Sequence, residues 1–290
     1  MRAFWGALVA AGLAAGALAA PVPVGPAASS IPLGSFTLTA LRDELNVVPN
    51  DGSVFGKDVG PAAVASTLAA ARAPTGQVTL GVDALLVRMP NRIILIDSGL
   101  GPKIGGRLMA SLAQASVSPT AVTDVLITHS HPDHVGGLVT AGGASVFPKA
   151  IIRMSAAEWA WMQQQAGQAA LVRAIRPQVR PFEPGRPLLP GITPIAIAGH
   201  TPGHVGYEIA SNGRRLIDIG DTAHSSIVSL ADPDWLIGYD GDPQTGKASR
   251  RAILTRLAAS RELVFAPHFP FPGFGRVVAK GQGFAWAPLR

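Results

Sequence analysis

Three of the seven histidines in this 290-residue chain lie in one hexapeptide, residues 129–134, with the sequence HSHPDH. Along an extended turn His129 and His131 alternate, so both rings can point the same way. Asp133 and His134 follow where the chain bends towards a helix, and they can face a second point. Neutral imidazoles and carboxylates are the ligands that zinc accepts where thiolates are missing. Four donors in one loop exceed the needs of one catalytic metal, so the hexapeptide predicts two metal ions.

The other polar residues that metal chemistry needs follow predicted strands. Residues 199–204, with the sequence GHTPGH, come after a predicted strand near 192–198 and include His200. Asp221 follows a predicted strand near 215–219, and His268 follows one near 263–266. Sites are usually built on loops at one edge of a sheet, so we expect these residues to converge with the hexapeptide.

Composition narrows the class of protein. Hydrophobic residues make up 48% of the chain and charged residues 14%, which excludes a disordered chain and allows a sizeable core. The absence of cysteine excludes disulfide scaffolds, thiolate zinc sites and iron–sulfur clusters. The net charge is +6, but the basic residues are dispersed and their densest group is only Arg250, Arg251 and Arg256. No nucleic-acid partner is therefore expected.

The first twenty residues have the pattern of a secretory signal. Arg2 precedes an uncharged run of Ala, Leu and Gly, and Ala17-Leu18-Ala19 gives the small-x-small pattern of a cleavage site. The alternative is an uncleaved membrane anchor, because the run reaches the lower length limit for a span. We expect a periplasmic or secreted protein without stable membrane insertion after cleavage. Residues 21–34 are predicted to form a flexible linker, and residues 35–290 one domain.

The remaining chain alternates short strands with few helices, which favours a sheet-rich α/β sandwich. A hairpin signal at Pro90-Asn91 joins two predicted strands, 78–89 and 92–96. Further strands are predicted at 36–41, 122–128, 150–154, 192–198, 205–210 and 215–219. Helices are predicted at 61–72, 104–115, 156–175 and 246–259, and a long connector at 177–190.

These motifs together resemble the metallo-β-lactamase superfamily. The matching pieces follow the family's order: residues 94–99, 128–134, 199–204, 220–221 and 266–268. The resemblance implies an α/β fold, a four-layer αβ/βα sandwich, with two divalent metal ions at the edge of its sheets and Zn²⁺ as the expected ion. It implies that His129, His131 and His200 hold the first metal, that Asp133, His134 and His268 hold the second, that Asp221 bridges them, and that Asp97 orients the ligand loop.

Within the superfamily, the chain resembles the branch of exported methyl parathion hydrolases and quorum-quenching lactonases. This likeness rests on the secretory start, the GDTAH run at 220–224, and the HFPFPGFG run at 268–275 with the aromatic tail at 284–286. True β-lactamases lack a carboxylate at the position of Asp221, so antibiotic hydrolysis is not expected. The resemblance implies a hydrolase that cleaves a small ester, lactone or phosphotriester with a hydroxide shared by the metals, and Asp133 or Asp221 would relay a proton.

Two other interpretations stay open at this point. A degenerate member of the fold would bind a metal or ligand without catalysis, and a di-iron member would carry redox chemistry, because the ligands alone do not select the metal. A small molecule is the expected partner in the leading interpretation. Relatives in the branch are often dimers, so a homodimer is an expected assembly.

Several residues near the predicted ligands have two interpretations each. His204 either supports a ligand carboxylate or forms structural hydrogen bonds in its turn, which we favour. His224 either lines the pocket or is structural. Phe269 and Phe271, like Phe274 and Trp235, form either an apolar pocket wall or ordinary core. Residues 240–242, Asp-Gly-Asp, either bind a third cation or form a turn, which we favour.

Overall fold

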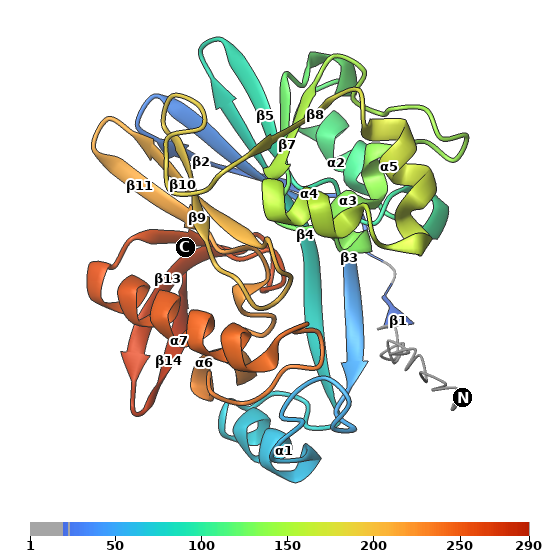
Figure 1. The fold of residues 1–290 in the computed structure, drawn as a ribbon. Coiled ribbons are helices and arrows are strands. Elements are labelled where there is room, and N and C mark those ends of the chain that lie inside the picture. Colours follow the sequence, from blue (N-terminus) through green and yellow to red (C-terminus); the bar gives the residue numbers. More distant parts are fainter. Residues whose placement is uncertain (1–19, 23, 290) are drawn as a thin grey trace, which may run out of the picture.

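Two β-sheets lie face to face between two layers of helices in the computed structural model, which describes residues 20–22 and 24–289 (Figure 1). Apolar side chains fill all three interfaces between these layers. Leu112 and Met162 belong to the cluster between the first sheet and its helices. Val87 and Tyr207 belong to the cluster between the sheets, and Leu254 to the cluster between the second sheet and its helix. The predicted four-layer αβ/βα sandwich is confirmed.

The first sheet has eight strands, and its long central pair is β3 (Phe36–Pro49) and β4 (Gln77–Met89), which are antiparallel. The predicted hairpin is confirmed, because β4 turns directly into β5 (Arg92–Ile96). From β5 the sheet continues in parallel through β6 (Asp124–Leu126), β7 (Ile151–Ser155) and β8 (Val179–Phe182). The carboxyl ends of these parallel strands meet at one edge, where the ligand loop begins.

The second sheet has six strands in the order β14-β13-β12-β11-β10-β9. Its strands are β9 (Ile192–Ala196), β10 (Val205–Ser211), β11 (Arg214–Asp218), β12 (Leu263–Phe265), β13 (Phe274–Lys280) and β14 (Gly283–Pro288). Only β11 and β12 are parallel neighbours. The strands predicted at 192–198, 205–210 and 215–219 are found within two residues of their expected bounds.

Helices cover the outer faces of both sheets (Figure 1). The first sheet packs against α2 (Leu108–Gln114), α4 (Ala156–Met162) and α5 (Ala169–Ile175), and the second packs against α7 (Pro243–Ser260). The other helices are α1 (Pro61–Ala70) and the two short segments α3 (Pro132–Val135) and α6 (Val228–Ala231). No helix in the described part of the chain has both the length and the apolar character that crossing a membrane requires.

The single helix predicted over 156–175 is wrong, because the segment breaks into α4, a 3₁₀ turn at Ala166–Gln168 and α5. Gln165 has extended backbone angles before the turn. Glutamine side chains cap the end of α4, since the amides of Gln163 and Gln165 donate to the carbonyls of Trp159 and Trp161. These local bonds compete with continued helix.

The flexible linker predicted over 21–34 is wrong for its second half. Residues Ala28–Leu33 form β2, which pairs with the amino-terminal half of β3 through a turn at Gly34. Pro32 argued against a strand in this segment, although proline is tolerated on an edge strand. The connector predicted over 177–190 likewise contains β8. The predicted signal lies outside the described residues, apart from Ala20, which begins the two-residue strand β1 (Ala20–Pro21) beside β3.

Candidate metal centre

The predicted ligands lie in loops that follow four strand ends. The loop after β6 carries the hexapeptide and ends in α3, and the loop after β9 carries His200. β11 runs into a 3₁₀ turn, Gly220–Thr222, that holds Asp221. β12 leads into residues 266–268, which end in His268. The buried strands fix the loop ends, and the seven predicted ligands form two groups that share Asp221.

In the first group, the ligand atoms of His129, His131, His200 and Asp221 all lie within 4.8 Å of one another. Nδ1 of His131 is 3.0 Å from Nε2 of His129 and 2.9 Å from Nε2 of His200. The two Nε2 atoms are 3.2 Å apart. Atoms 2.0–2.1 Å from one tetrahedral ion stand about 3.3 Å from each other, so this spacing fits a zinc-sized ion.

The second group contains Asp133, His134, His268 and again Asp221. Oδ1 of Asp221 lies 3.1 Å from Nε2 of His134 and 3.0 Å from Nε2 of His268. Oδ2 of Asp221 faces the first group instead, 3.3 Å from Nε2 of His200. Oδ2 of Asp133 completes the second group at 3.5 Å and 3.8 Å from the two imidazoles. Each oxygen of Asp221 therefore faces a different group.

Hydrogen bonds on the outer side of three rings fix which nitrogen carries the proton. Nδ1 of His134 lies 2.8 Å from Oδ2 of Asp97, and Nδ1 of His268 lies 2.6 Å from the carbonyl oxygen of Gly81. Nδ1 of His200 lies 3.2 Å from Oδ1 of Asp240. Because carbonyl and carboxylate oxygens only accept, each Nδ1 donates. Each Nε2 then points into the centre, and on loss of its proton it offers a lone pair to a metal ion.

Several inward atoms have no hydrogen-bond partner within the described structure. Nε2 of His134, Nε2 of His268 and Oδ1 of Asp221 are buried and unpaired. Buried polar atoms in native proteins are nearly always satisfied. Three such atoms around one point, all imidazole nitrogen or carboxylate oxygen, are the donor set expected around a divalent cation. The residues present therefore fit the implied metals.

Burial and charge set the protonation of these groups. Burial, reinforced by the neighbouring imidazoles, lowers the pKa of His131 to about 3 and the pKa of His129 well below its ordinary value. Both rings are therefore neutral, as ligands must be. Burial opposes the charge of Asp221, but the imidazoles of His134 and His268 outweigh it and hold the pKa of Asp221 well below its usual range. The bridging carboxylate is ionised.

Asp97, expected to orient the ligand loop, lies at the end of β5 and bonds to two parts of that loop. Its Oδ1 accepts from the amide of Thr128 at 2.8 Å, and its Oδ2 accepts from the Thr128 hydroxyl at 2.7 Å and from His134. Asp97 has a φ of 62°, a conformation that Asp tolerates better than most residues. The Asp97 side chain thus bonds both to the start of the ligand loop, at Thr128, and to the last ligand of the hexapeptide, His134.

His204 belongs to neither group of ligand atoms. Its Nδ1 donates to the carbonyl of Ile197 at 2.8 Å, and its Nε2 accepts from the amide of Asp221 at 3.0 Å. A side chain at Gly220 would place its Cβ only 2.5 Å from that Nε2, so this close approach needs glycine. His204 therefore makes structural hydrogen bonds, and through them it fixes the backbone of the bridging residue.

His224 lies directly against the two groups. Its Nε2 is 3.2 Å from Oδ2 of Asp221, and its ring stacks on His268 with centroids 5.3 Å apart and planes 10° apart. The ring of Tyr239 also lies near His224, with the two ring centroids 5.3 Å apart. His224 is buried beside the ligands, whereas Tyr239 lines the adjoining cleft.

A cleft of about 710 Å³ opens beside the first group. His131 and His200 lie at its metal end, and its apolar surface comes from Trp161, Pro202 and Tyr239. The edge of Trp161 faces the ring of His131 at a centroid distance of 6.0 Å. The cleft thus offers a small organic molecule an apolar surface next to the candidate metal site.

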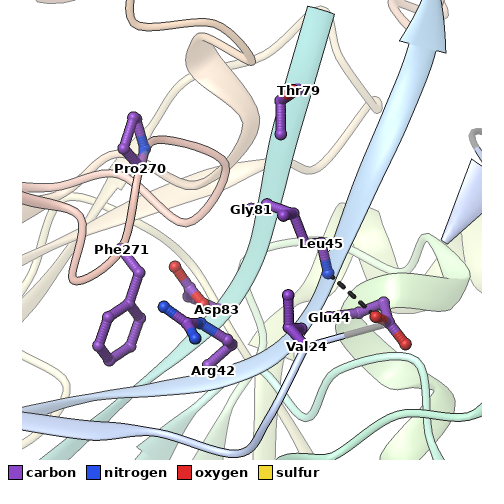
Figure 2. A pocket seen from close by; sticks show the side chains of 9 residues that line it. All are labelled: Val24, Arg42, Glu44, Leu45, Thr79, Gly81, Asp83, Pro270 and Phe271. Atoms are coloured by element: carbon purple, nitrogen blue, oxygen red, sulfur yellow. Dashed lines mark hydrogen bonds between the residues drawn. The ribbon is translucent and has the colours of Figure 1, made fainter. Parts of the chain in front are cut away.

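Neither Phe269 nor Phe271 lines this cleft, so the structure does not support the pocket-wall interpretation there and supports the core interpretation for Phe269. Phe269 is fully buried in the core beneath α7 and contacts Trp286 edge to face at 4.9 Å. Phe271 lines a separate cavity of about 240 Å³ between β3, β4 and residues 270–271 (Figure 2). Both phenylalanines follow His268 in sequence, but the chain turns away from the metal groups immediately after that residue.

The separate cavity contains an unpaired buried acid. Arg42 lies over the ring of Phe271, 4.4 Å from its centroid. Asp83 lies beside Arg42 (Figure 2), and neither of its carboxylate oxygens has a hydrogen-bond partner in the described part of the chain. Burial raises the pKa of Asp83 well above its usual value. Gly81 also lines this cavity and accepts from His268, so the cavity adjoins the backbone that supports the second group.

The Asp240-Gly241-Asp242 segment supports the structure with each carboxylate separately. Asp240 joins His200 to Arg250, whose Nη1 lies 3.3 Å from Oδ2 of Asp240. Asp242 caps α7 by accepting from the amide of Thr245 at 3.1 Å. The two carboxylates have different protein partners, which disfavours the third-cation interpretation.

Sequence reasoning missed three residues that support the centre. Asp240 was assigned only to a turn, and its partner Arg250 only to a basic cluster, although Arg250 is 1% exposed and donates to the carbonyl of Pro233 at 2.9 Å. Glu158 was assigned only to a helix, although it is fully buried and bonds to both loops of the first group. No sequence signal separates such residues from ordinary surface charges, because their partners lie far away in the chain.

The profile of the metallo-beta-lactamase superfamily matches residues 78–268. The chain therefore belongs to this superfamily, as its motifs predicted. Metallo-beta-lactamase domain-containing protein 1 of Xenopus laevis is 30% identical over 168 residues, which are 56% of this chain and 61% of that protein. The mouse protein of the same name is 42% identical over 62 residues, 21% of each chain. The chain thus spans less than two thirds of the length of these relatives.

Solved structures resemble the chain over nearly its whole described length. AidC, described as a dizinc quorum-quenching lactonase, superposes with a TM-score of 0.87 at 28% identity and covers 91% of this chain and 98% of its own. AbOPH, described as a hydrolase in the beta lactamase superfamily, has a TM-score of 0.84 at 29% identity, covering 92% and 99%. A probable metal-dependent hydrolase from Staphylococcus aureus shares the fold, with a TM-score of 0.74 at 20% identity over 90% and 99%.

Proposed function

We propose that the protein is a binuclear metal hydrolase that cleaves a small lactone or a related ester. The observation that carries this proposal is the orientation of Asp221, whose Oδ2 faces His200 and whose Oδ1 faces His268. One carboxylate placed between two sets of imidazoles is suited to hold two ions close enough to act on one substrate. Zn²⁺ is the proposed ion at both positions, supported by the donor set and by the dizinc description of AidC.

The chain's own residues would bind, orient and move protons. Bound divalent ions supply Lewis acidity and lower the pKa of a coordinated water towards neutrality. Asp97 and Asp240 hold the rings of His134 and His200 in the tautomer that points Nε2 inwards. Asp133 is partly exposed, with a quarter of its side chain accessible, so its Oδ2 is suited to take a proton from the attacking water and to pass it to a leaving alkoxide.

The cleft supports a substrate with an apolar portion. Trp161, Pro202 and Tyr239 line it beside the first group, and its charged lining is confined to His131 and His200, Asp240 and Asp242. Lactones and esters with an aliphatic or aryl arm would place the carbonyl at the ligands and the arm against these rings. The description of AidC as a lactonase supports a lactone as the first candidate substrate. An aryl phosphotriester is the second candidate, and its support is the resemblance of the sequence motifs.

The experiment is a kinetic comparison on zinc-loaded protein of measured metal content. Its substrates are an N-acyl homoserine lactone, an aryl ester and an aryl phosphotriester. We expect the highest kcat/KM for the lactone, and loss of turnover in Asp221→Asn. Asp234→Asn is the control, because Asp234 is exposed and pairs with Arg251 on the surface. Turnover of none of the three by protein holding two metals would favour a binding role, and tightly bound iron with redox activity would favour the di-iron alternative.

We also propose that the protein is exported and works in the periplasm or outside the cell. The support is the sequence pattern of residues 1–20. Expression of the full chain in a Gram-negative host, followed by cell fractionation and mass measurement, tests the proposal. A periplasmic product shortened by about twenty residues is expected, and a full-length cytosolic product would contradict it. Light scattering of the same product tests the proposed homodimer.

A further inference from the structure

Glu158 is a buried carboxylate on α4 that no part of the proposed chemistry uses. It stands at the third position of the helix after the N-cap Ser155, whose hydroxyl accepts from the amide of Glu158 at 3.1 Å. In a capping box, a glutamate at this position turns back to the N-cap amide. Here its side chain instead points away from the helix start, and the whole residue is inaccessible to solvent.

The carboxylate of Glu158 joins the two loops that form the first metal group. Its Oε1 accepts from the amide of Ser130 at 2.7 Å and from the Ser130 hydroxyl at 2.6 Å. Its Oε2 accepts from the hydroxyl of Thr201 at 2.6 Å and from the amide of Gly203 at 3.1 Å. Ser130 lies between the ligands at positions 129 and 131, and Thr201 directly follows the ligand at position 200.

Burial of the Glu158 carboxylate costs free energy, because the group loses its contact with water. In the described part of the chain, no basic side chain lies within ion-pair distance of Glu158, so four hydrogen bonds alone compensate its burial. The donors are divided evenly between two loops that are far apart in sequence. An apolar residue would fill the same volume without desolvating a charge. The carboxylate therefore serves to fasten one loop to the other.

We propose that Glu158 is a positioning residue that sets the distance between His129 and His131 on one loop and His200 on the other. The three imidazole nitrogens lie 2.9–3.2 Å apart, and a single metal ion tolerates little change in that spacing. All four hydrogen bonds of Glu158 go to residues that flank ligands of the first group, so its main effect is expected at the first metal. This inference rests on the proposed two-metal function, but it concerns metal retention and not the choice of substrate.

The test substitutes Glu158→Gln, which keeps the shape but replaces one accepting oxygen with an NH₂ group. One backbone amide, that of Ser130 or of Gly203, then loses its acceptor, because an amide hydrogen cannot reorient as a hydroxyl can. Gln163→Ala is the control at the other end of the same helix: it removes the side-chain bond of the exposed Gln163 to the carbonyl of Trp159, and it leaves in place all four bonds of Glu158 and the bond of the Ser155 hydroxyl to the carbonyl of Gly203. Circular dichroism of the metal-free forms checks that both variants fold.

The readouts are metal content after dialysis against a competing chelator and the visible spectrum of the Co²⁺-substituted protein. We expect the wild type and Gln163→Ala to retain two equivalents. We expect Glu158→Gln to lose the ion of the first group, with its affinity reduced about tenfold or more, and to show an altered Co²⁺ spectrum. Equal retention and identical spectra in all three proteins would overturn the proposal, as would equal losses in both variants.

This experiment separates the proposal from the function it rests on. A wild type that holds two metals but hydrolyses no substrate overturns the proposed hydrolase and still tests Glu158 by metal retention. A wild type that holds no metal overturns both. If Glu158→Gln does not fold, Thr201→Val takes its place, because it removes one of the four bonds and should give a smaller change of the same kind.

Discussion

Oδ1 of Asp240 lies 3.2 Å from Nδ1 of His200, on the side of the ring opposite Asp221. The imidazole is thus held between two carboxylates. Burial opposes its charge, but the hydrogen bonds that it donates to Asp221 and Asp240 raise the pKa of His200 to about 9. In the metal-free protein near pH 7 this ring holds a proton that a metal ion must displace, so we expect proton release when the first position is filled.

Asp240→Asn should weaken metal binding by the first group. The variant removes the charge that holds the His200 tautomer, and such outer partners typically contribute 10–100-fold to metal affinity. Asp240→Ala should also lower the free energy of unfolding by about 3–5 kcal/mol, because it leaves the buried guanidinium of Arg250 unpaired. Chelator competition and chemical denaturation measure the two effects. Asp242→Asn is the neighbouring control, and a metal loss as large as that of Asp240→Asn would contradict the assignment.

Asp97→Asn should act on the second group in the same way. Asn keeps one accepting oxygen for the Thr128 amide, but its NH₂ group can accept from neither the Thr128 hydroxyl nor Nδ1 of His134. Metal affinity should fall about 10–100-fold, chiefly at the position served by His134. Anomalous diffraction from zinc-soaked crystals distinguishes the positions. Depletion of the same position in Asp97→Asn and Asp240→Asn would refute the separate roles.

Metal removal should destabilise the folded state. Without ions, inward nitrogen and oxygen atoms such as Nε2 of His268 are buried with no partner. Ions that bind only the folded state stabilise it by about 4.1 kcal/mol at a free concentration a thousand times Kd. Chelation should therefore lower Tm, and added Zn²⁺ should restore it in proportion to the logarithm of its concentration. A Tm that does not respond to either treatment would contradict a resident metal.

The metal ligands could be predicted from the sequence because each belongs to a local sequence pattern. Each lies directly after a short apolar strand, and His129 to His134 are packed too closely for chance. Strands at one sheet edge then bring the loops together, so Asp221 could be placed with His268 before any coordinates were known. The hairpin of β4 and β5 was equally local, since Pro90-Asn91 marks its turn.

The supporting residues could not be found in the same way. Glu158 fits a helix-start pattern, and only the fold shows that its carboxylate reaches Ser130 and Thr201. Asp240 fits a turn, and its bond to His200 crosses forty residues. Phe269 follows a ligand in sequence, which suggested a pocket, but the chain turns into the core after His268. Long-range hydrogen bonds and the direction of a loop leave no local pattern.

Asp83→Asn should stabilise the protein at neutral and alkaline pH. Burial raises the pKa of Asp83 well above the value of 3.8 that it has when exposed, although Arg42 and His268 oppose this shift and Asp43 adds to it. A raised carboxyl pKa means that the folded state binds the proton more tightly than the unfolded state. The stability that the protonated Asp83 contributes to the folded state is therefore fully present below pH 3.8, and it declines as the pH rises towards the pKa of Asp83 in the folded protein.

The asparagine variant has no proton to lose, so that decline should be absent from it. At pH 8 its free energy of unfolding should exceed that of the wild type by about 1–3 kcal/mol, because the ionised wild type buries an unpaired charge whereas the variant buries only a neutral amide. Near pH 4 the two proteins should converge. Urea denaturation from pH 4 to 9 measures both curves, with Asp234→Asn as an exposed control that should change stability little. Parallel curves for wild type and Asp83→Asn across this range would show that the acid is paired or accessible in solution.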